Sequence, residues 1–331
     1  MTSLTPRTMV PRMRRFFTLF ESLLTRHFSL FLIVALAAGL FFPRLADFSA
    51  PLIFPVLMGV IYLSFLKTDY EILVREIRNG KRQLWLNLFC LILLPSLLFL
   101  AVRALEQLAG THPAWGTGVL LLYACPVAAL APTLALVMHG HFERTLCTLI
   151  LTSMIAPFTL PLLLSFWVGA TMEVEIWEMI RFLAKLILIP FAAAQLTLRR
   201  GKPILKVLKP HTASLSVVLL CLVVLGAVSG LSGTVKENPT AVLEGVAVAS
   251  GCMMLAYAIG WILHFPGASL RDRSTLAIVA TWTNIGLSIV FAKQFFPGSD
   301  ILLFVILAEI PWNLAFVPAH AFIRRKSVSY V

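Results

Sequence analysis

Long apolar stretches recur along the chain and alternate with short polar segments. The stretches are continuously apolar rather than alternating, and each is long enough to cross a hydrocarbon core of about 30 Å as a helix. The pattern therefore predicts an all-α polytopic membrane protein. We expect ten transmembrane helices, at residues 28–46, 49–66, 84–104, 114–138, 144–169, 176–198, 212–232, 241–263, 274–297 and 300–323.

Composition and charge agree with a membrane protein. Hydrophobic residues make up 59% of the chain and charged residues 13%, whereas soluble domains are about a quarter charged. The net charge of +12 could indicate a nucleic-acid partner, but most Lys and Arg lie before span 1 or in segments that follow even-numbered spans. The positive-inside rule makes these segments cytoplasmic. No nucleic-acid partner is therefore expected, and both termini should be cytoplasmic in a bacterial inner (cytoplasmic) membrane.

The predicted spans divide the chain into four parts. Residues 1–27 contain "RMRRFFTLFESLL", which predicts a cytoplasmic amphipathic helix, with a disordered basic tail as the alternative. Residues 28–169 and 170–323 would form two five-helix repeats, and an odd number of spans per repeat inverts the second one in the bilayer. Residues 324–331 form a cytoplasmic tail.

Two predicted spans carry features that disturb a helix at membrane depth. Pro126 and Pro132 lie six residues apart in span 4, and Thr283, Asn284 and Gly286 meet at the centre of span 9. Irregular backbone in a bilayer is tolerated only where it is buried in protein or lines a wet cavity. We therefore expect spans 4 and 9 to be broken helices that cross. The alternative is a pair of ordinary kinks with interhelical hydrogen bonds.

Four segments carry a resemblance to a known family. "CPVAALAPTLALVMHGHFERTLCTLILTSMIAPFTLPLLL" (125–164) resembles spans 4 and 5 of the bile acid:sodium symporter family. "TLAIVATWTNIGLSIVFA" (275–292) is similar to its span 9, "LAKLILIP" (183–190) to its span 6, and "WN" (312–313) to a Trp-His-Asn run in its span 10. The resemblance implies ten spans, a panel and a core domain, and a crossing where spans 4 and 9 unwind.

The chain departs from the family at the positions that the resemblance assigns to sodium. Family members that use sodium carry oxygen-bearing side chains there, including a Glu and two Gln. The residues at the registered positions are Cys90, Ala131, Pro132, Thr145, Leu149, Val279 and Thr283. Sodium is a hard cation that prefers oxygen ligands, and most of these side chains offer none. The sequence therefore argues against sodium coupling.

Glu309 is the ionisable residue that stands out within a span. It lies nine residues after Asp300, about 14 Å into the bilayer, and Pro311 should disturb the helix beside it. A carboxylate at this depth indicates a functional site, either a proton carrier or a binder of a cationic group. The alternative is a structural pair, for which Lys185 is the basic candidate. Asn313 should lie on the same helix face as Glu309.

These features give a set of candidate residues for a substrate or ion pathway. The set is Pro126, Pro132, Thr133, Thr145, Thr283, Asn284, Glu309 and Asn313. No metal site or cofactor is expected, because the five cysteines lie in predicted spans without zinc spacing. His139 and His141, in "HGHFER", are expected to lie in a solvated loop.

The function expected from these observations is secondary transport of a small organic anion or amphipath by alternating access. Coupling would be to protons through Glu309, or absent. Arsenite-type efflux is an alternative because Cys125 stands in span 4, and a non-transporting sensor or scaffold is another. An enzyme is not expected, because HExxH, GxGD and paired intramembrane aspartates are absent from the sequence.

Overall fold

The computed structural model describes residues 21, 23–25, 27–66, 76, 80–169, 175–264 and 267–315. Most of the amphipathic segment expected over 1–27, the end of span 10 and the tail 324–331 lie outside these residues. Within them the secondary structure is helical, and a β-bridge between Val127 and Thr283 belongs to no strand.

The described helices follow one another with short connections. They are α2 (Phe28–Phe41), α3 (Pro43–Ser49), α4 (Ile53–Phe65), α6 (Gly80–Leu88), α7 (Leu94–Ala109), α8 (Ala114–Ala124), α9 (Ala131–Val137), α10 (Phe142–Trp167), α11 (Ile176–Arg200), α12 (Lys202–Ala227), α13 (Ser232–Glu237), α14 (Pro239–Ile262), α15 (Leu270–Thr281), α16 (Ile285–Phe295) and α17 (Asp300–Leu307). A 3₁₀ turn, η1 (Ala50–Leu52), joins α3 to α4, and a π-helical turn, η2 (Phe89–Leu93), joins α6 to α7.

Six helical stretches in the described residues are long and apolar enough to cross a membrane. They are Pro43–Phe65, Gly80–Ala109, Phe142–Trp167, Ile176–Arg200, Pro203–Ala227 and Pro239–Ile262. These stretches match spans 2, 3, 5, 6, 7 and 8 of the sequence prediction, and the prediction of an all-α membrane protein is confirmed. The apolar helices α2, α8 and α16 are shorter.

The basic segment between spans 6 and 7 differs from the expected connection. Residues 199–210 are helical apart from Gly201, so α11 and α12 extend beyond the predicted spans. Pro203 stands in the first turn of α12, where a missing backbone N–H costs nothing. The polar sequence therefore continues the two helices instead of forming a loop.

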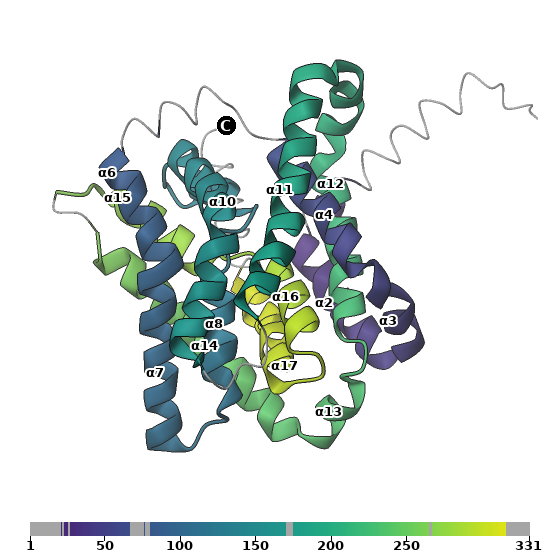
Figure 1. Ribbon diagram of the computed structural model, residues 1–331, viewed down its shortest axis with the longest axis vertical. Coiled ribbons are helices and arrows are strands. Elements are labelled where there is room, and N and C mark those ends of the chain that lie inside the picture. Colours follow the sequence, from purple (N-terminus) through teal and green to yellow (C-terminus); the bar gives the residue numbers. More distant parts are fainter. Residues whose placement is uncertain are drawn as a thin grey trace, which may run out of the picture.

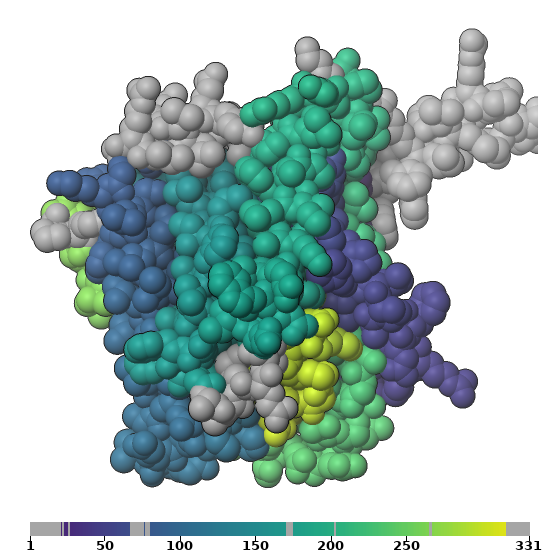
Figure 2. All heavy atoms as spheres, viewed as in Figure 1, coloured from purple at the N-terminus to yellow at the C-terminus, as the bar shows by residue number. Residues whose placement is uncertain are grey.

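The helices pack in two groups that lie side by side in Figure 1. On the right, α12 packs against α2, α3 and α4, and α11 packs against α4. In the other group α7 packs on α8, α14 on α15, and α17 on α8. Contacts between α10 and α11 join the groups, and Figure 2 shows the α11 surface between α7 and the N-terminal helices.

Glycines permit the closest helix approaches within the second group. A Cβ on Gly260 of α14 would lie 2.7 Å from the Cα of Ala277 in α15. A Cβ on Gly118 of α8 would lie 2.6 Å from the ring of Phe304 in α17. Small residues at such contacts let helices in a bilayer approach closely, which strengthens their van der Waals packing.

Candidate functional site

The helices at spans 4 and 9 are both interrupted, and the interruptions bond to each other. α8 ends at Ala124 and α9 begins at Ala131, while α15 ends at Thr281 and α16 begins at Ile285. The Ala128 N–H donates to the Trp282 carbonyl at 2.8 Å, and the Asn284 N–H donates to the Pro126 carbonyl at 2.7 Å. The two extended segments thus satisfy each other's backbone groups at the point where the helices stop.

Local sequence explains where each helix stops. Cys125 is extended, with φ −71° and ψ 154°, as expected for a residue that precedes a proline. Pro132 lies in the first turn of α9, so it starts a helix and does not break one. On the other strand of the bridge, the Asn284 side chain caps α16 by accepting a hydrogen bond from the Leu287 N–H at 3.1 Å.

A cavity of about 110 Å³ lies against the paired segments. Its walls come from α2, α4, α10, α11, α12, both interruptions and the residues that follow α17. The lining residues are Phe28, Leu32, Val60, Ile61, Ser64, Phe65, Pro126–Leu130, Leu149, Ser153, Ile187, Leu220, Trp282–Leu287, Glu309, Trp312 and Asn313. We call this space the crossing cavity. Its lining is mainly apolar, with a few polar side chains, as is common in small-molecule sites.

Glu309 supplies the carboxylate of the crossing cavity. The helix is interrupted by a turn at Ala308, and residues 309–315 are helical again. Glu309 is 5% exposed, and the Asn313 side-chain amide donates both to Glu309 Oε2 and to the Glu309 carbonyl, each at 2.8 Å. The expected shared face of Glu309 and Asn313 is confirmed. Lys185 is exposed and forms no ion pair with Glu309 in the described structure, so the proposed structural pair is wrong.

Two polar atoms of residues that line the crossing cavity have no hydrogen-bond partner among the described residues. They are the Thr283 hydroxyl and the Trp312 indole N–H, both buried. Buried polar groups in proteins are nearly always satisfied by protein or water. The unpaired atoms therefore indicate groups available to water or to a ligand in the cavity.

The structure brings five of the sequence-derived candidates together at the crossing cavity. They are Pro126, Thr283, Asn284, Glu309 and Asn313. The other three lie elsewhere: Pro132 starts α9, Thr133 is exposed on α9, and Thr145 is buried and donates to the His141 carbonyl. Sequence reasoning missed the role of Trp282 and Trp312 as cavity walls. Their positions beside the predicted break and beside Glu309 were the signal for it.

The positions registered with the family's sodium ligands are dry and apolar here. Cys90, in the π-helical turn η2, places its thiol 3.7 Å from the carbonyl of Val279, to which it donates. Ala131, Val279 and Leu149 are buried. Their side chains supply no oxygen, although the resemblance brought the right elements together, because η2 does pack on α15.

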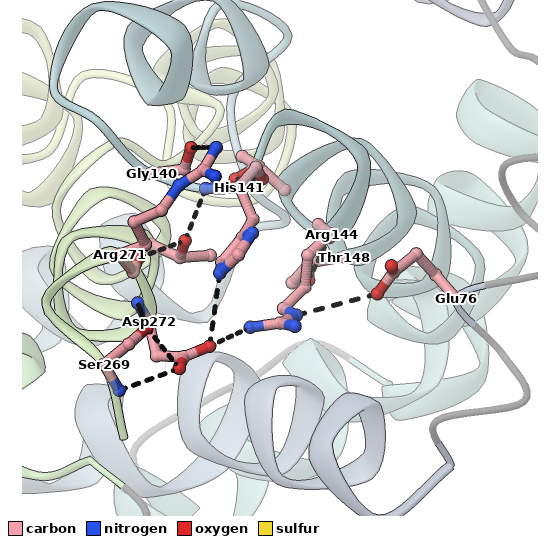
Figure 3. A network of polar contacts seen from close by, with 10 residues as sticks. Glu76, Gly140, His141, Arg144, Thr148, Ser269, Arg271 and Asp272 are labelled. Carbon is pink, nitrogen blue, oxygen red and sulfur yellow. Dashed lines mark hydrogen bonds and ion pairs between the residues drawn. The ribbon is translucent and has the colours of Figure 1, made fainter.

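A second polar cluster joins the turn before α10 to the start of α15. Figure 3 shows Arg144 between two carboxylates, with an ion pair to Asp272 and another to Glu76 at 3.6 Å. The His141 ring lies 3.5 Å from Asp272, and the His141 backbone N–H donates to the Thr275 hydroxyl at 2.8 Å. We call these residues the Arg144 network.

The environment of the Arg144 network sets the charges of its members. Burial lowers the pKa of His141, and the charge of Arg144 lowers it further, against the opposing effect of Asp272. Burial raises the pKa of Asp272, but hydrogen bonds from Ser269 and Arg144 outweigh it and hold that pKa at about 2. The expectation that His141 lies in a solvated loop is wrong, because Asp272 and Thr275 both contact it.

These features define a class: a polytopic helical membrane protein with two broken helices and a buried carboxylate around a central cavity. The chain belongs to the Sodium Bile acid symporter family, whose model matches residues 52–238. The protein is therefore an integral membrane protein of a transporter family. It is also similar to "Uncharacterized protein YbaS" of Bacillus subtilis (strain 168), with 25% identity over 209 residues, 56% of this chain. The match covers 65% of YbaS, so the chain spans less than two thirds of that relative.

Proposed function

We propose that the protein is a secondary transporter that moves a small amphipathic solute by alternating access through the crossing cavity. The observation that carries the proposal is the position of the cavity, where two interrupted helices pair through Val127 and Thr283. Transporter binding sites are commonly built from such discontinuous helices near the bilayer midplane. The chemistry needed for binding, an apolar lining with a few polar groups, is present there.

We also propose ten spans in two inverted repeats, over 28–169 and 170–323, with both termini cytoplasmic in a bacterial inner membrane. Contacts between segments support this arrangement. Asp47 accepts a hydrogen bond from Ser229, and His112 contacts Asp300, and all four belong to the predicted outer side. The Arg144 network joins segments that are predicted to be cytoplasmic. Contacts within each predicted side are what ten alternating spans require.

Alternating access would come from movement between the two helix groups. The crossing cavity is lined by α2, α4, α11 and α12 on one side and by the interrupted helices on the other. Rocking of one group against the other would open the cavity to each side in turn. The paired interruptions would stay together during this movement, because their hydrogen bonds join two elements of the same group.

We propose that Glu309, and not sodium, provides any ion coupling. Support comes from the side chains at the family's sodium positions, where Cys90 donates to Val279 and oxygen ligands are lacking. A lone carboxylate at membrane depth is suited to carrying a proton. Without proton coupling the protein would be a uniporter.

The alternatives find less support. Arsenite-type efflux needs an accessible thiol in the position of Cys125, which is 1% exposed. A scaffold that has lost transport would need no cavity with unpaired polar groups. Since members of the family are transporters, we also propose no enzymatic activity.

Cysteine accessibility tests the proposed function. In a variant without the five native cysteines, Thr283→Cys and Asn284→Cys should react with a small water-soluble thiol reagent. Thr145→Cys, buried away from the cavity, is the matched control and should stay inert. Inert cysteines at both positions would favour the scaffold. Stabilisation of the purified protein by sodium, measured as a rise in Tm, would contradict the claim on coupling.

A further inference from the structure

We propose that the solute bound in the crossing cavity is an organic cation, a protonated amine on a compact apolar body, and that it exchanges with a proton on Glu309. This inference rests on the proposed transport function and names its substrate class. It departs from the organic anion expected from the sequence. Three observations carry it: the charge of the cavity, its aromatic walls and its size.

The charge of the crossing cavity favours a cation. Among the residues that line it, Glu309 alone has an ionisable side chain, and Lys, Arg and His are missing from the lining. A buried carboxylate is costly unless it binds a proton or meets a positive charge. An anion would meet a like charge in a desolvated site with nothing to offset it, whereas an ammonium group would supply the missing partner.

The charged groups on the surrounding elements are committed elsewhere. Lys293 of α16 donates to the Gly226 carbonyl at 2.7 Å and does not line the cavity. Arg144 of α10 is held in its own network, and Lys185 of α11 is exposed. The titratable group that does face Glu309 is the Cys221 thiol of α12, which is neutral and cannot offset an anion.

Aromatic side chains complete a site for an amine. Trp282, Trp312, Phe28 and Phe65 line the same cavity as Glu309. The face of an aromatic ring attracts a cation, most strongly for Trp, and the effect grows when the site is desolvated. The unpaired Thr283 hydroxyl can accept a hydrogen bond from an ammonium group that Glu309 holds.

The size of the cavity limits the apolar body of the solute. A cavity of about 150 Å³ lined by aliphatic and aromatic side chains holds a benzene molecule. The crossing cavity, at about 110 Å³, is on the same scale in this conformation. A single ring or a short branched chain would fit beside the carboxylate, and a large amphipath would not.

One carboxylate that serves two cations produces exchange. When the ammonium group binds, the Glu309 carboxyl gives up its proton to water, and when the proton returns the ammonium group loses its partner. Binding of either cation weakens binding of the other by the same factor. A carrier with this property moves the amine in one direction and a proton in the other.

The experiment uses the full chain in lipid nanodiscs and three probes of similar shape: 2-phenylethylammonium, 3-phenylpropionate and 3-phenylpropanol. Calorimetry between pH 6 and 8, in buffers of different ionisation enthalpy, gives Kd and the protons released. We expect the ammonium probe to bind with release of close to one proton, and its Kd to fall by up to tenfold per pH unit. The carboxylate probe should bind at least tenfold more weakly.

Variants assign the effect to Glu309. Glu309→Gln should weaken ammonium binding at least tenfold and remove proton release, while leaving the alcohol probe little affected. Glu309→Asp keeps the charge and should keep proton release, so it separates loss of charge from loss of fold. Glu244→Gln is the matched control, because Glu244 is a partly buried carboxylate outside the cavity, bonded to His112 and Trp115.

Several outcomes would overturn the inference. Preferred binding of the carboxylate probe, binding of the ammonium probe without proton release, or failure of all three probes would each do so. The proposed function fails separately. If the ammonium probe binds as expected but shows no counterflow in proteoliposomes, the cation site stands and transport does not. If the carboxylate probe is transported, transport stands and the cation site does not.

Discussion

At the scale of single residues, Asn313 decides how Glu309 is held. Its amide donates to the Glu309 carboxylate and to the Glu309 backbone carbonyl, each at 2.8 Å. Asn87 makes the second kind of bond without the first, donating to the Gln83 carbonyl four residues earlier at 2.7 Å. Comparison of the two asparagines isolates the bond to the carboxylate.

We therefore expect Asn313→Ala to destabilise the protein more than Asn87→Ala does. Loss of the Asn313 amide leaves a buried carboxylate oxygen unsatisfied, at a cost of about 1–3 kcal/mol, whereas loss of one backbone contact costs about 0.5–1.5 kcal/mol. Thermal unfolding of both variants in detergent measures the difference. Equal losses would mean that the carboxylate gains nothing from Asn313.

Arg144 is the residue on which the second polar cluster depends. We expect Arg144→Gln to destabilise the protein by about 3 kcal/mol near neutral pH, because it leaves Asp272 and Glu76 without their cation. The double variant Arg144→Gln/Asp272→Asn should recover part of the loss. A double variant less stable than Arg144→Gln alone would contradict this reading of the network.

The stabilisation from Asp272 has a defined pH range. Its pKa is lowered from 3.8 to about 2 in the folded protein, so its contribution is fully present above pH 4 and is lost as the pH falls towards 2. In Arg144→Gln the pKa of Asp272 should rise, and the acid-dependent loss should become smaller and begin at higher pH. Urea unfolding at several pH values, with wild type and variant compared, measures the shift.

At the scale of elements, the interruption between α8 and α9 depends on one of its two prolines. Pro126 keeps Cys125 extended, and its carbonyl accepts the Asn284 N–H, while Pro132 only begins α9. Pro126→Ala should let α8 continue and should weaken the pairing with 282–284. The two bonds of that pairing contribute about 0.5–1.5 kcal/mol each.

We expect Pro126→Ala to lower Tm clearly and Pro132→Ala to change it little. The pair is matched because both prolines are buried in the same segment and the same substitution is made at each. Thermal unfolding is the measurement. A larger effect at Pro132 would move the origin of the break to the start of α9.

The contact between α14 and α15 gives a second test at this scale. A Cβ on Gly260 would lie 2.7 Å from the Ala277 backbone, whereas a Cβ on Gly251, also in α14, would meet nothing within 4 Å. Gly260→Ala should therefore cost about 1–3 kcal/mol through overpacking. Gly251→Ala should be neutral or stabilise by up to about 1 kcal/mol through helix propensity. Similar Tm values for the two variants would contradict the close approach.

At the scale of the whole molecule, the arrangement of segments in the membrane follows from contacts at the two ends. Hydrogen bonds and ion pairs join predicted outer segments to each other and predicted cytoplasmic segments to each other. Lys236 and Arg200 are exposed and lie in segments predicted on opposite sides. In intact cells, Lys236→Cys should react with a membrane-impermeant thiol reagent and Arg200→Cys should not. Reaction at both or neither would contradict the proposed topology.

The sequence by itself determined the class of the protein and the elements that form its site. Continuous apolar runs can satisfy their backbone in a bilayer only as helices, and a proline or a polar cluster at midspan must interrupt such a helix. For this reason the breaks near Pro126 and Asn284, and Glu309 with Asn313, could be predicted from local sequence.

Only the tertiary structure decided which of these features act together. Pro132, Thr133 and Thr145 share segments with cavity residues but lie away from the cavity, because the helical period and the packing of neighbours fix which side chains face inward. The same packing brings Trp282, Trp312 and Glu309 together and keeps Lys, Arg and His out of the lining. The charge of a cavity is a sum over elements far apart in the chain. Local patterns fix the elements, and long-range packing fixes the chemistry of the space between them.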